Sequence, residues 1–178
     1  LDLVEHAFGL MRNGPKPVIA AVNGLAMAGG LEMVMACDLV FAAESAKLGD
    51  AHSNFGVFPG AGGAAILPKR IGLNRAKYLL FSGDNVSARD MMDWGLVNTV
   101  VPDAQLREVV QVFTDRLADK SPAGLRRMKA VANRSLNVDE TAALAEEMLN
   151  LRAHMRSWDM REGLTAFGEK RKPQFRGY

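Results

Sequence analysis

Residues 18–38 read VIAAVNGLAMAGGLEMVMACD, and this stretch decides what kind of fold the chain can form. It opens with the β-rich apolar run Val18–Val22, which Asn23-Gly24 closes as a turn. After Gly29-Gly30 the run Leu31–Cys37 is short and apolar, which is typical of a buried helix. A buried strand followed so closely by a buried helix indicates an α/β protein.

The segments downstream of this stretch extend the pattern. Short strands are expected at 38–42, 46–48 and 97–101, and helices at 62–70 and 74–81. Ser87 is expected to cap a further helix through Trp94, with Asp90 completing a capping box. Beyond residue 104 the pattern is helical, at 105–119, at 122–133 and in a long run from 139 towards 158. The sequence therefore predicts an α/β core in 1–104 and a helical C-terminal region in 105–178.

Composition limits the kinds of partner that this chain can have. Its 178 residues suffice for a domain with a substantial core, and its net charge of +2 is too small to imply a polyanionic partner. The lone cysteine, Cys37, excludes a disulfide framework and favours a reducing, cytoplasmic setting. No apolar stretch approaches the ~20 residues that a membrane span needs, so no membrane partner is expected.

Glu32 is the strongest candidate for chemistry, because it is the one charged side chain between Leu25 and Cys37. A carboxylate buried among methionine and valine is costly unless it is paired or used, and general acid/base catalysis is a common use. The alternative is that Glu32 reaches the rim of the core or pairs with a basic residue. Gly29-Gly30 also allows two interpretations, either a tight turn or a helix N-terminus whose N–H faces a developing negative charge.

Other motifs give weaker indications. Residues 56–65 contain a relaxed G-x-G-x-x-A, but Pro59 breaks the strand that a dinucleotide-binding loop requires. None of the three histidines has metal-ligand spacing, so no metal centre is expected. His52 follows Asp50 in a short polar loop, where it is either a surface histidine or an acid, base or hydrogen-bond donor.

Taken in order, several segments resemble the crotonase, or enoyl-CoA hydratase/isomerase, superfamily. Each is commonplace alone, but their order is specific, and the match covers essentially the whole chain from Pro15. The segments include Lys16–Gly24, Ala28–Glu32, Ala36–Asp38, Leu48-Gly49, Pro59–Gly63, Ser82-Gly83, Gly95–Val97 and Glu169–Arg171. The resemblance implies a crotonase-like spiral of ββα turns, followed by C-terminal helices that assemble a homotrimer or a hexamer of two trimers.

The resemblance also implies roles for individual residues. Gly29 matches a backbone N–H donor that holds the thioester oxygen while an enolate forms, and Glu32 matches the glutamate that activates the attacking water. Phe167 and Lys170 match positions that contact the coenzyme A of a neighbouring subunit. Further substrate or CoA contacts are implied for Ala26, Ala28, Pro59, Gly60 and Gly62.

Two departures from the family pattern bear on the reaction. The N-terminal part of the family's domain, which usually supplies the second oxyanion donor, is absent from this sequence. His52 stands where hydratases carry their second glutamate, and this makes it a candidate proton donor.

The reaction that the resemblance implies is addition of water to the 2,3-double bond of an enoyl-CoA, with no cofactor beyond the CoA of the substrate. The alternatives are a double-bond isomerase, thioester hydrolase or decarboxylase that uses the same enolate, or a catalytically weak binding or assembly protein. Nucleic acid is not an expected partner, because no aromatic stacking platform accompanies the basic residues of the C-terminal helices.

Overall fold

The computed structural model describes residues 2–178. They form two compact units, one made of residues 2–12 and 18–111 and the other of residues 13–17 and 112–178. The predicted division between 1–104 and 105–178 stays a prediction.

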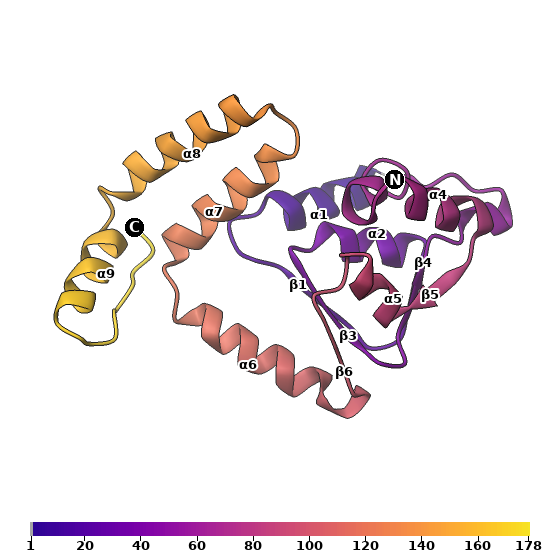
Figure 1. Ribbon diagram of the computed structural model, residues 1–178, viewed down its shortest axis with the longest axis horizontal. Helices are drawn as coiled ribbons and strands as arrows, with labels where there is room; N and C mark the ends of the chain where they lie inside the picture. The colour runs from indigo at the N-terminus through magenta and orange to yellow at the C-terminus, as the bar shows by residue number, and fades with distance from the viewer. Residues whose placement is uncertain (1) are drawn as a thin grey trace. The chain divides into compact units, whose positions relative to one another are not determined.

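The strands of the first unit alternate between two three-stranded sheets (Figure 1). One sheet is wholly parallel and contains β1 (Ile19–Val22), β3 (Leu39–Ala43) and β6 (Thr99–Val101). The other contains β2 (Leu25–Met27), β4 (Lys47–Gly49) and β5 (Asn85–Ser87), with β4 parallel to β2 and antiparallel to β5. Each of the pairs β1–β2 and β3–β4 adds one strand to each sheet, so the chain advances as a spiral. This confirms the predicted α/β fold.

Helices fill and cover these turns of the spiral. They are α1 (Asp2–Asn13), α2 (Gly29–Ala36), α3 (Leu67–Ile71), α4 (Leu73–Ser82) and α5 (Ala88–Asp93), with single 3₁₀ turns η1 (His52–Phe55) and η2 (Asp103–Gln105). The core includes side chains that lose all contact with solvent, among them Leu31 and Met35 of α2, Leu48 of β4 and Leu79 of α4.

The short helix α2 is fixed at both ends by the neighbouring backbone. The N–H of Ala28, just before the helix, donates to the carbonyl of Gly49 at 3.1 Å. Beyond the helix, the Asp38 carboxylate accepts the N–H of Val18 at 2.7 Å, and the Asp38 N–H donates to the Val18 carbonyl. Helix α2 is therefore attached to the strands on either side of it, which fixes the direction of the side chains that it carries.

Several expected elements are confirmed, and others differ. The capping box is present, because Ser87 Oγ accepts the Asp90 N–H while the Asp90 carboxylate accepts the Ser87 N–H. The helix expected over 62–70 begins only at Leu67, because Gly62 has a φ of +132° and residues 62–66 form a turn closed by the Ile66 N–H on the Gly62 carbonyl. Helix α1 and strands β2 and β5 were not predicted.

The second unit consists of helices joined by capped turns. Helix α6 (Leu106–Ala118) begins in the first unit, and α7 (Pro122–Ser135), α8 (Glu140–His154) and α9 (Trp158–Gly168) follow, with α7 and α8 forming an antiparallel hairpin (Figure 1). The long run predicted from 139 towards 158 is two helices, because Ser157 accepts the Met160 N–H and so starts α9.

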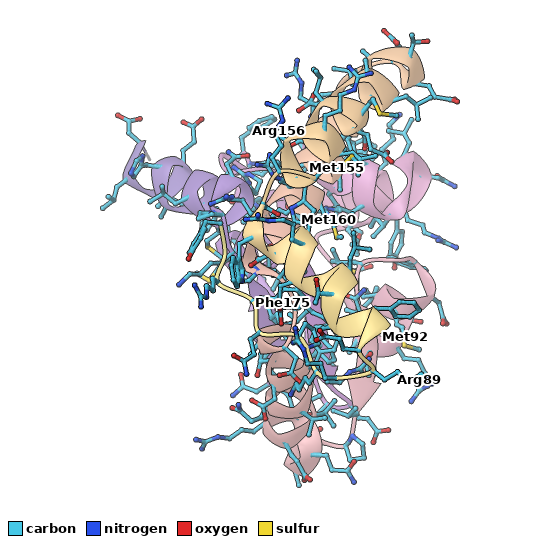
Figure 2. The ribbon with its side chains drawn as sticks, turned by 90° about the vertical axis from the view of Figure 1, so that its left-hand side faces the viewer. Arg89, Met92, Met155, Arg156, Met160 and Phe175 are labelled. Atoms are coloured by element: carbon cyan, nitrogen blue, oxygen red, sulfur yellow. The ribbon has the colours of Figure 1, made fainter. Side chains whose placement is uncertain are left out.

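Asp159 attaches the C-terminal segment to α9. Its carboxylate accepts the N–H groups of Arg176 (2.7 Å) and Gly177 (3.0 Å) and the hydroxyl of Ser121 (2.5 Å). Burial alone would raise the pKa of Asp159, but the combined hydrogen bonds lower it below its ordinary value. In Figure 2, Phe175 lies on this segment beside α9, and its Cε1 lies 3.6 Å from the position that a Cβ on Gly163 would take, an ordinary packing distance.

Candidate active site

Glu32 lies in the first turn of α2 with its side chain buried, 4% exposed. One carboxylate oxygen, Oε1, accepts two backbone hydrogen bonds, from the N–H of Ala61 at 2.7 Å and the N–H of Gly63 at 2.9 Å. Neither predicted alternative holds, since Glu32 is buried rather than at a rim and its hydrogen-bond donors are backbone amides rather than a basic residue. Within residues 2–178, Oε2 accepts no hydrogen bond, so one oxygen fixes the position of the carboxylate and the other has no hydrogen-bond donor.

The loop that holds Glu32 contains three of the predicted substrate-binding residues, Pro59, Gly60 and Gly62. Its compactness depends on Gly63, because a Cβ atom there would lie 2.6 Å from Cβ of Pro59. The loop therefore bends closely enough to direct two N–H groups at one oxygen. Sequence reasoning did not identify Ala61 and Gly63 as the partners of Glu32, because neither residue has a functional side chain.

Gly29 begins the same helix, three residues before Glu32. The first intrahelical bond runs from the Glu32 N–H to the Ala28 carbonyl at 3.0 Å, so the Gly29 N–H lies in the turn that has no intrahelical acceptor. Gly29 is exposed, and no heavy atom lies within 4 Å of the position that its Cβ would occupy. A carbonyl oxygen can therefore approach the positive end of the helix at this point.

Ala26 and Ala28 precede Gly29 and lie next to the N-terminus of α2. Ala28 has a φ of 49°, which is uncommon for a residue with a side chain. Ala26 on β2 is buried, and its Cβ lies 3.9 Å from the position that a Cβ on Gly30 would take. The side chain of Ala26 is therefore packed against the start of α2, and only the backbone of Ala26 could contact a ligand.

His52 lies at the start of η1 beside a carboxylate, and sequence analysis had not assigned this pairing. Its ring Nδ1 lies 2.9 Å from Oδ1 of Asp50, and its backbone N–H donates to the same oxygen at 3.3 Å. The Asp50 side chain is 1% exposed and that of His52 is 11% exposed. The D-x-H spacing directly after a buried strand was the available signal for this pair.

Gly63 connects the two acidic groups. Its N–H donates to Glu32, and a Cβ on Gly63 would lie 2.7 Å from Oδ2 of Asp50. Glu32 and Asp50, which are 18 positions apart, therefore face the same glycine. The structure thus brings Glu32, the loop at 59–63 and the Asp50–His52 pair into one region of the first unit.

Phe167 and Lys170 belong to the second unit, at the end of α9. Phe167 is 86% exposed, and Lys170 is exposed with a φ of 55°, its N–H donating to the Phe167 carbonyl at 3.3 Å. The neighbouring cations are engaged within the unit, because Arg171 pairs with Glu162 and Glu169, and Lys172 pairs with Asp119. Phe167 and Lys170 are therefore an exposed apolar residue and an exposed cationic residue, joined by a backbone hydrogen bond at the end of α9.

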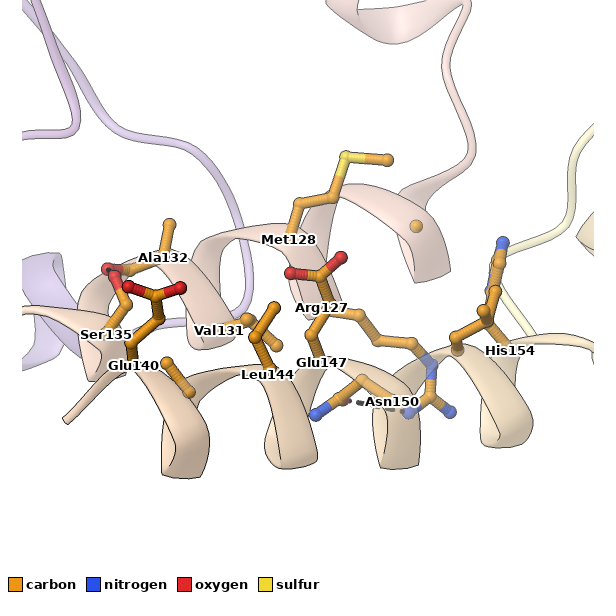
Figure 3. Close-up of a pocket in the computed structure, with 13 residues that line it drawn as sticks. Arg127, Met128, Val131, Ala132, Ser135, Glu140, Leu144, Glu147, Asn150 and His154 are labelled. Carbon is orange, nitrogen blue, oxygen red and sulfur yellow. Dashed lines mark hydrogen bonds between the residues drawn. The ribbon is translucent and has the colours of Figure 1, made fainter. Parts of the chain in front are cut away.

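A groove of about 550 Å³ lies between α7 and α8 and contains none of the predicted site residues (Figure 3). Its lining is mainly apolar, with Met128, Val131 and Leu144 prominent, and Arg127 donates to Asn150 at 3.4 Å along one side. Among the described residues, no group of three or more His, Cys, Asp or Glu side chains is placed to hold a metal ion. None of the described helices is long and apolar enough to cross a membrane.

A two-sheet ββα spiral, with a buried carboxylate at the open end of a short apolar helix, defines a crotonase-fold protein. The model of the enoyl-CoA hydratase/isomerase family matches residues 3–178, and the chain belongs to this family.

Relatives within the family carry hydratase names. The chain is 39% identical to the crotonyl-CoA hydratase of Syntrophomonas wolfei over 173 residues, which are 97% of this chain and 66% of that protein. It is 36% identical to the short-chain-enoyl-CoA hydratase of Clostridium acetobutylicum over 157 residues, 88% of this chain and 60% of that protein. The crystal structure of an enoyl-CoA hydratase from Bacillus anthracis superposes with a TM-score of 0.96 at 37% identity, covering 99% of this chain and 69% of that one. The chain thus spans about two thirds of the length of these relatives.

Proposed function

We propose that the protein is an enoyl-CoA hydratase-like enzyme that adds water across the 2,3-double bond of an enoyl-CoA thioester. The observation that carries this proposal is the arrangement on α2, where an open N–H at Gly29 precedes a buried, backbone-held carboxylate at Glu32 by one helical turn. The hydratase names of relatives at 36–39% identity support the same reaction.

In the proposed mechanism, the Gly29 N–H donates a hydrogen bond to the thioester oxygen as negative charge develops on it. Glu32 takes a proton from water through the oxygen that the loop leaves free, and the water oxygen bonds to C3. His52 delivers a proton to C2 of the resulting enolate. Water is thereby added in full, and the proton held by Glu32 returns to His52 through solvent before the next turnover.

Substrate binding and assembly form a second part of the proposal. Phe167 and Lys170 would contact the CoA nucleotide, since an exposed ammonium group suits a phosphate and an exposed ring suits a base. A homotrimer or a hexamer of two trimers is supported by exposed apolar side chains on α7 and α8, including Met128, Leu144 and Leu149. A cytoplasmic setting is supported by the lone cysteine, and the reaction would need no cofactor besides the substrate's CoA.

Steady-state turnover of a short enoyl-CoA, with crotonyl-CoA as the first substrate, tests the proposal. The expected result is formation of the 3-hydroxyacyl-CoA, identified by mass spectrometry as a gain of one water. Products of isomerisation, thioester hydrolysis or decarboxylation from matched CoA substrates, with no hydration, would contradict it. An enzyme that catalyses one of these other reactions is the second candidate function. It is favoured by His52, which stands at the position where hydratases carry a glutamate.

A binding or assembly protein without turnover is a weaker candidate. The basic residues that would have faced nucleic acid make contacts within the second unit, where Lys129 donates to the Lys16 carbonyl and Arg134 pairs with Glu146. An electrophoretic shift with RNA, combined with the absence of any CoA turnover, would favour this candidate over an enzyme.

A further inference from the structure

We propose that Asp50 is a positioning residue for His52, holding its ring so that Nδ1 carries the hydrogen and Nε2 is the nitrogen that exchanges a proton with the substrate. The inference rests on the proposed function for the identity of the reaction, but the pairing itself is a property of the first unit. It is carried by three independent observations of geometry.

The first observation is that one carboxylate oxygen receives both donors of a single residue. Oδ1 of Asp50 lies 2.9 Å from Nδ1 of His52 and accepts the His52 backbone N–H at 3.3 Å. A carboxylate oxygen only accepts hydrogen bonds, so Nδ1 is the donor in this pair. The neutral ring is then protonated at Nδ1, which leaves Nε2 with its lone pair directed elsewhere.

The second observation is the backbone between the two residues. Ala51 is buried and adopts a left-handed conformation with a φ of 58°, which is unfavourable for a residue that has a Cβ. This conformation turns the chain directly after β4, so that side chains two residues apart meet at one oxygen. If residue 51 were extended, the side chains of Asp50 and His52 would lie on the same face of a strand. The backbone N–H and the ring Nδ1 of His52 would then not both reach Oδ1 of Asp50.

The third observation is that Asp50 has no other hydrogen-bonding partner among the residues that the structure describes. Its Oδ2 is buried and accepts no hydrogen bond, and it lies where a side chain on Gly63 would be. A buried carboxylate held for structure alone would normally have its oxygens satisfied by backbone N–H groups, as Asp159 has in the second unit. Both hydrogen bonds of the Asp50 carboxylate are made with His52, so the carboxylate acts on the orientation and protonation of that ring.

Nitrogen-15 NMR of histidine-labelled protein tests the pairing directly. The three histidines would be assigned with the His52→Gln variant, and the neutral ring of His52 is expected in the Nδ1–H form. In Asp50→Ala the same ring is expected to revert to the Nε2–H form, whereas the exposed control Asp93→Ala should leave it unchanged. A parent protein with His52 in the Nε2–H form overturns the proposal without the need for any variant.

Kinetics of a double-mutant cycle test the positioning role. Asp50→Ala should lower kcat about 10-fold or more with KM nearly unchanged, as part of the ~10²–10⁴-fold contribution of a positioned acid. In the His52→Ala background it should cost nothing further, because Asp50 acts through that ring. An equal loss in both backgrounds, or a fall in melting temperature with kcat retained, means a structural role and overturns the proposal. If the parent hydrates no enoyl-CoA while His52 is in the Nδ1–H form, the proposed function fails and the pairing stands.

Discussion

Glu32 is held by the backbone of a loop 29 to 31 positions further along the chain, not by a basic side chain. Two N–H donors on one oxygen stabilise a buried carboxylate without adding a competing positive charge near a reacting group. The same loop glycine that donates to Glu32 makes room for Asp50, so the two acidic groups depend on one small residue. At the scale of residues, the site therefore depends on backbone N–H donors and on the lack of a Cβ at Gly63, which allows the close packing of the loop.

The proposed role of Glu32 as general base predicts the behaviour of Glu32→Gln. The amide oxygen of glutamine can still accept both N–H groups, so the melting temperature should be nearly unchanged. Turnover of crotonyl-CoA should fall about 100-fold or more, because the variant cannot take a proton from water. The exposed control Glu44→Gln should keep full turnover, and near-normal turnover in Glu32→Gln would rule out the assignment.

The close packing around Gly63 predicts that Gly63→Ala is destabilising. Its new Cβ would lie 2.6 Å from Cβ of Pro59 and 2.7 Å from Oδ2 of Asp50, so the loop must shift. Overpacking of this kind typically costs ~1–3 kcal/mol, measurable by urea unfolding, and turnover should fall with it. Gly24→Ala is the matched control, since no heavy atom lies within 4 Å of its Cβ position. Equal stability of the two variants would contradict the packing argument.

Among the elements, those whose ends are fixed by local hydrogen bonds have boundaries close to the predicted ones. Helix α5 starts at the capping box of Ser87, and α4 ends at Gly83, which has a φ of 68°. Elements without such local signals were missed or misplaced, including β2, whose three residues become a strand only by pairing with β4. Whether a short segment of the spiral becomes a strand therefore depends more on the strand that it pairs with than on its own sequence.

The capping box predicts the cost of Ser87→Ala. The substitution removes the acceptor for the Asp90 N–H and the partner of the Asp90 carboxylate, so α5 should lose about 1 kcal/mol of stability. Ser87→Asp, which retains an acceptor at the cap, is the conservative comparison and should lose less. Chemical denaturation of both variants measures the difference, and an unchanged Ser87→Ala would show that the cap contributes nothing.

The ion pair that closes the turn after α9 predicts a pH-dependent stability. Hydrogen bonds from Arg171 and from the Gln174 N–H hold the pKa of Glu162 at about 2, below its ordinary value of 4.5. Since the folded-state pKa is lowered, the contribution of Glu162 is complete above pH 4.5 and is lost as the pH falls towards about 2. Glu162→Gln should therefore lower the melting temperature at pH 7, and the difference from the parent should vanish near pH 2.

The matched control for that experiment is Glu147→Gln, at an exposed glutamate of α8. Its melting temperature should follow that of the parent at every pH. A Glu162→Gln variant whose difference from the parent persists unchanged at pH 2 would show that the Arg171 ion pair is not the cause.

At the scale of the whole molecule, the groups proposed for catalysis and the two residues proposed to contact the CoA nucleotide lie in different units. Glu32, Gly29 and His52 lie in the first unit, whereas Phe167 and Lys170 lie in the second. The proposed contact of Phe167 and Lys170 with a neighbouring subunit's CoA would let assembly, rather than one chain, complete the binding site. The exposed apolar faces of α7 and α8 suit such an assembly.

This arrangement predicts that Lys170→Ala weakens CoA binding and leaves the chemical step alone. The Kd for CoA, measured by titration calorimetry at low ionic strength, should rise roughly 1.4- to 5-fold, as the loss of one exposed ion pair of ~0.2–1 kcal/mol implies. The effect should shrink in high salt, because screening already weakens the contact. Lys172→Ala removes a cation that pairs with Asp119 and is the control. An unchanged Kd at low salt would leave Lys170 without a role in CoA binding.

The sequence alone determined the features whose causes are local. The first strand and the helix of residues 18–38, the burial of Glu32, the cap at Ser87 and the family all follow from residue types at fixed spacing. Only the tertiary structure decided that the N–H groups of Ala61 and Gly63 meet Glu32, and that a left-handed Ala51 brings His52 to Asp50. The physical reason is that backbone donors have the same chemistry in every residue, so their partners are set by the register of distant segments and not by residue type.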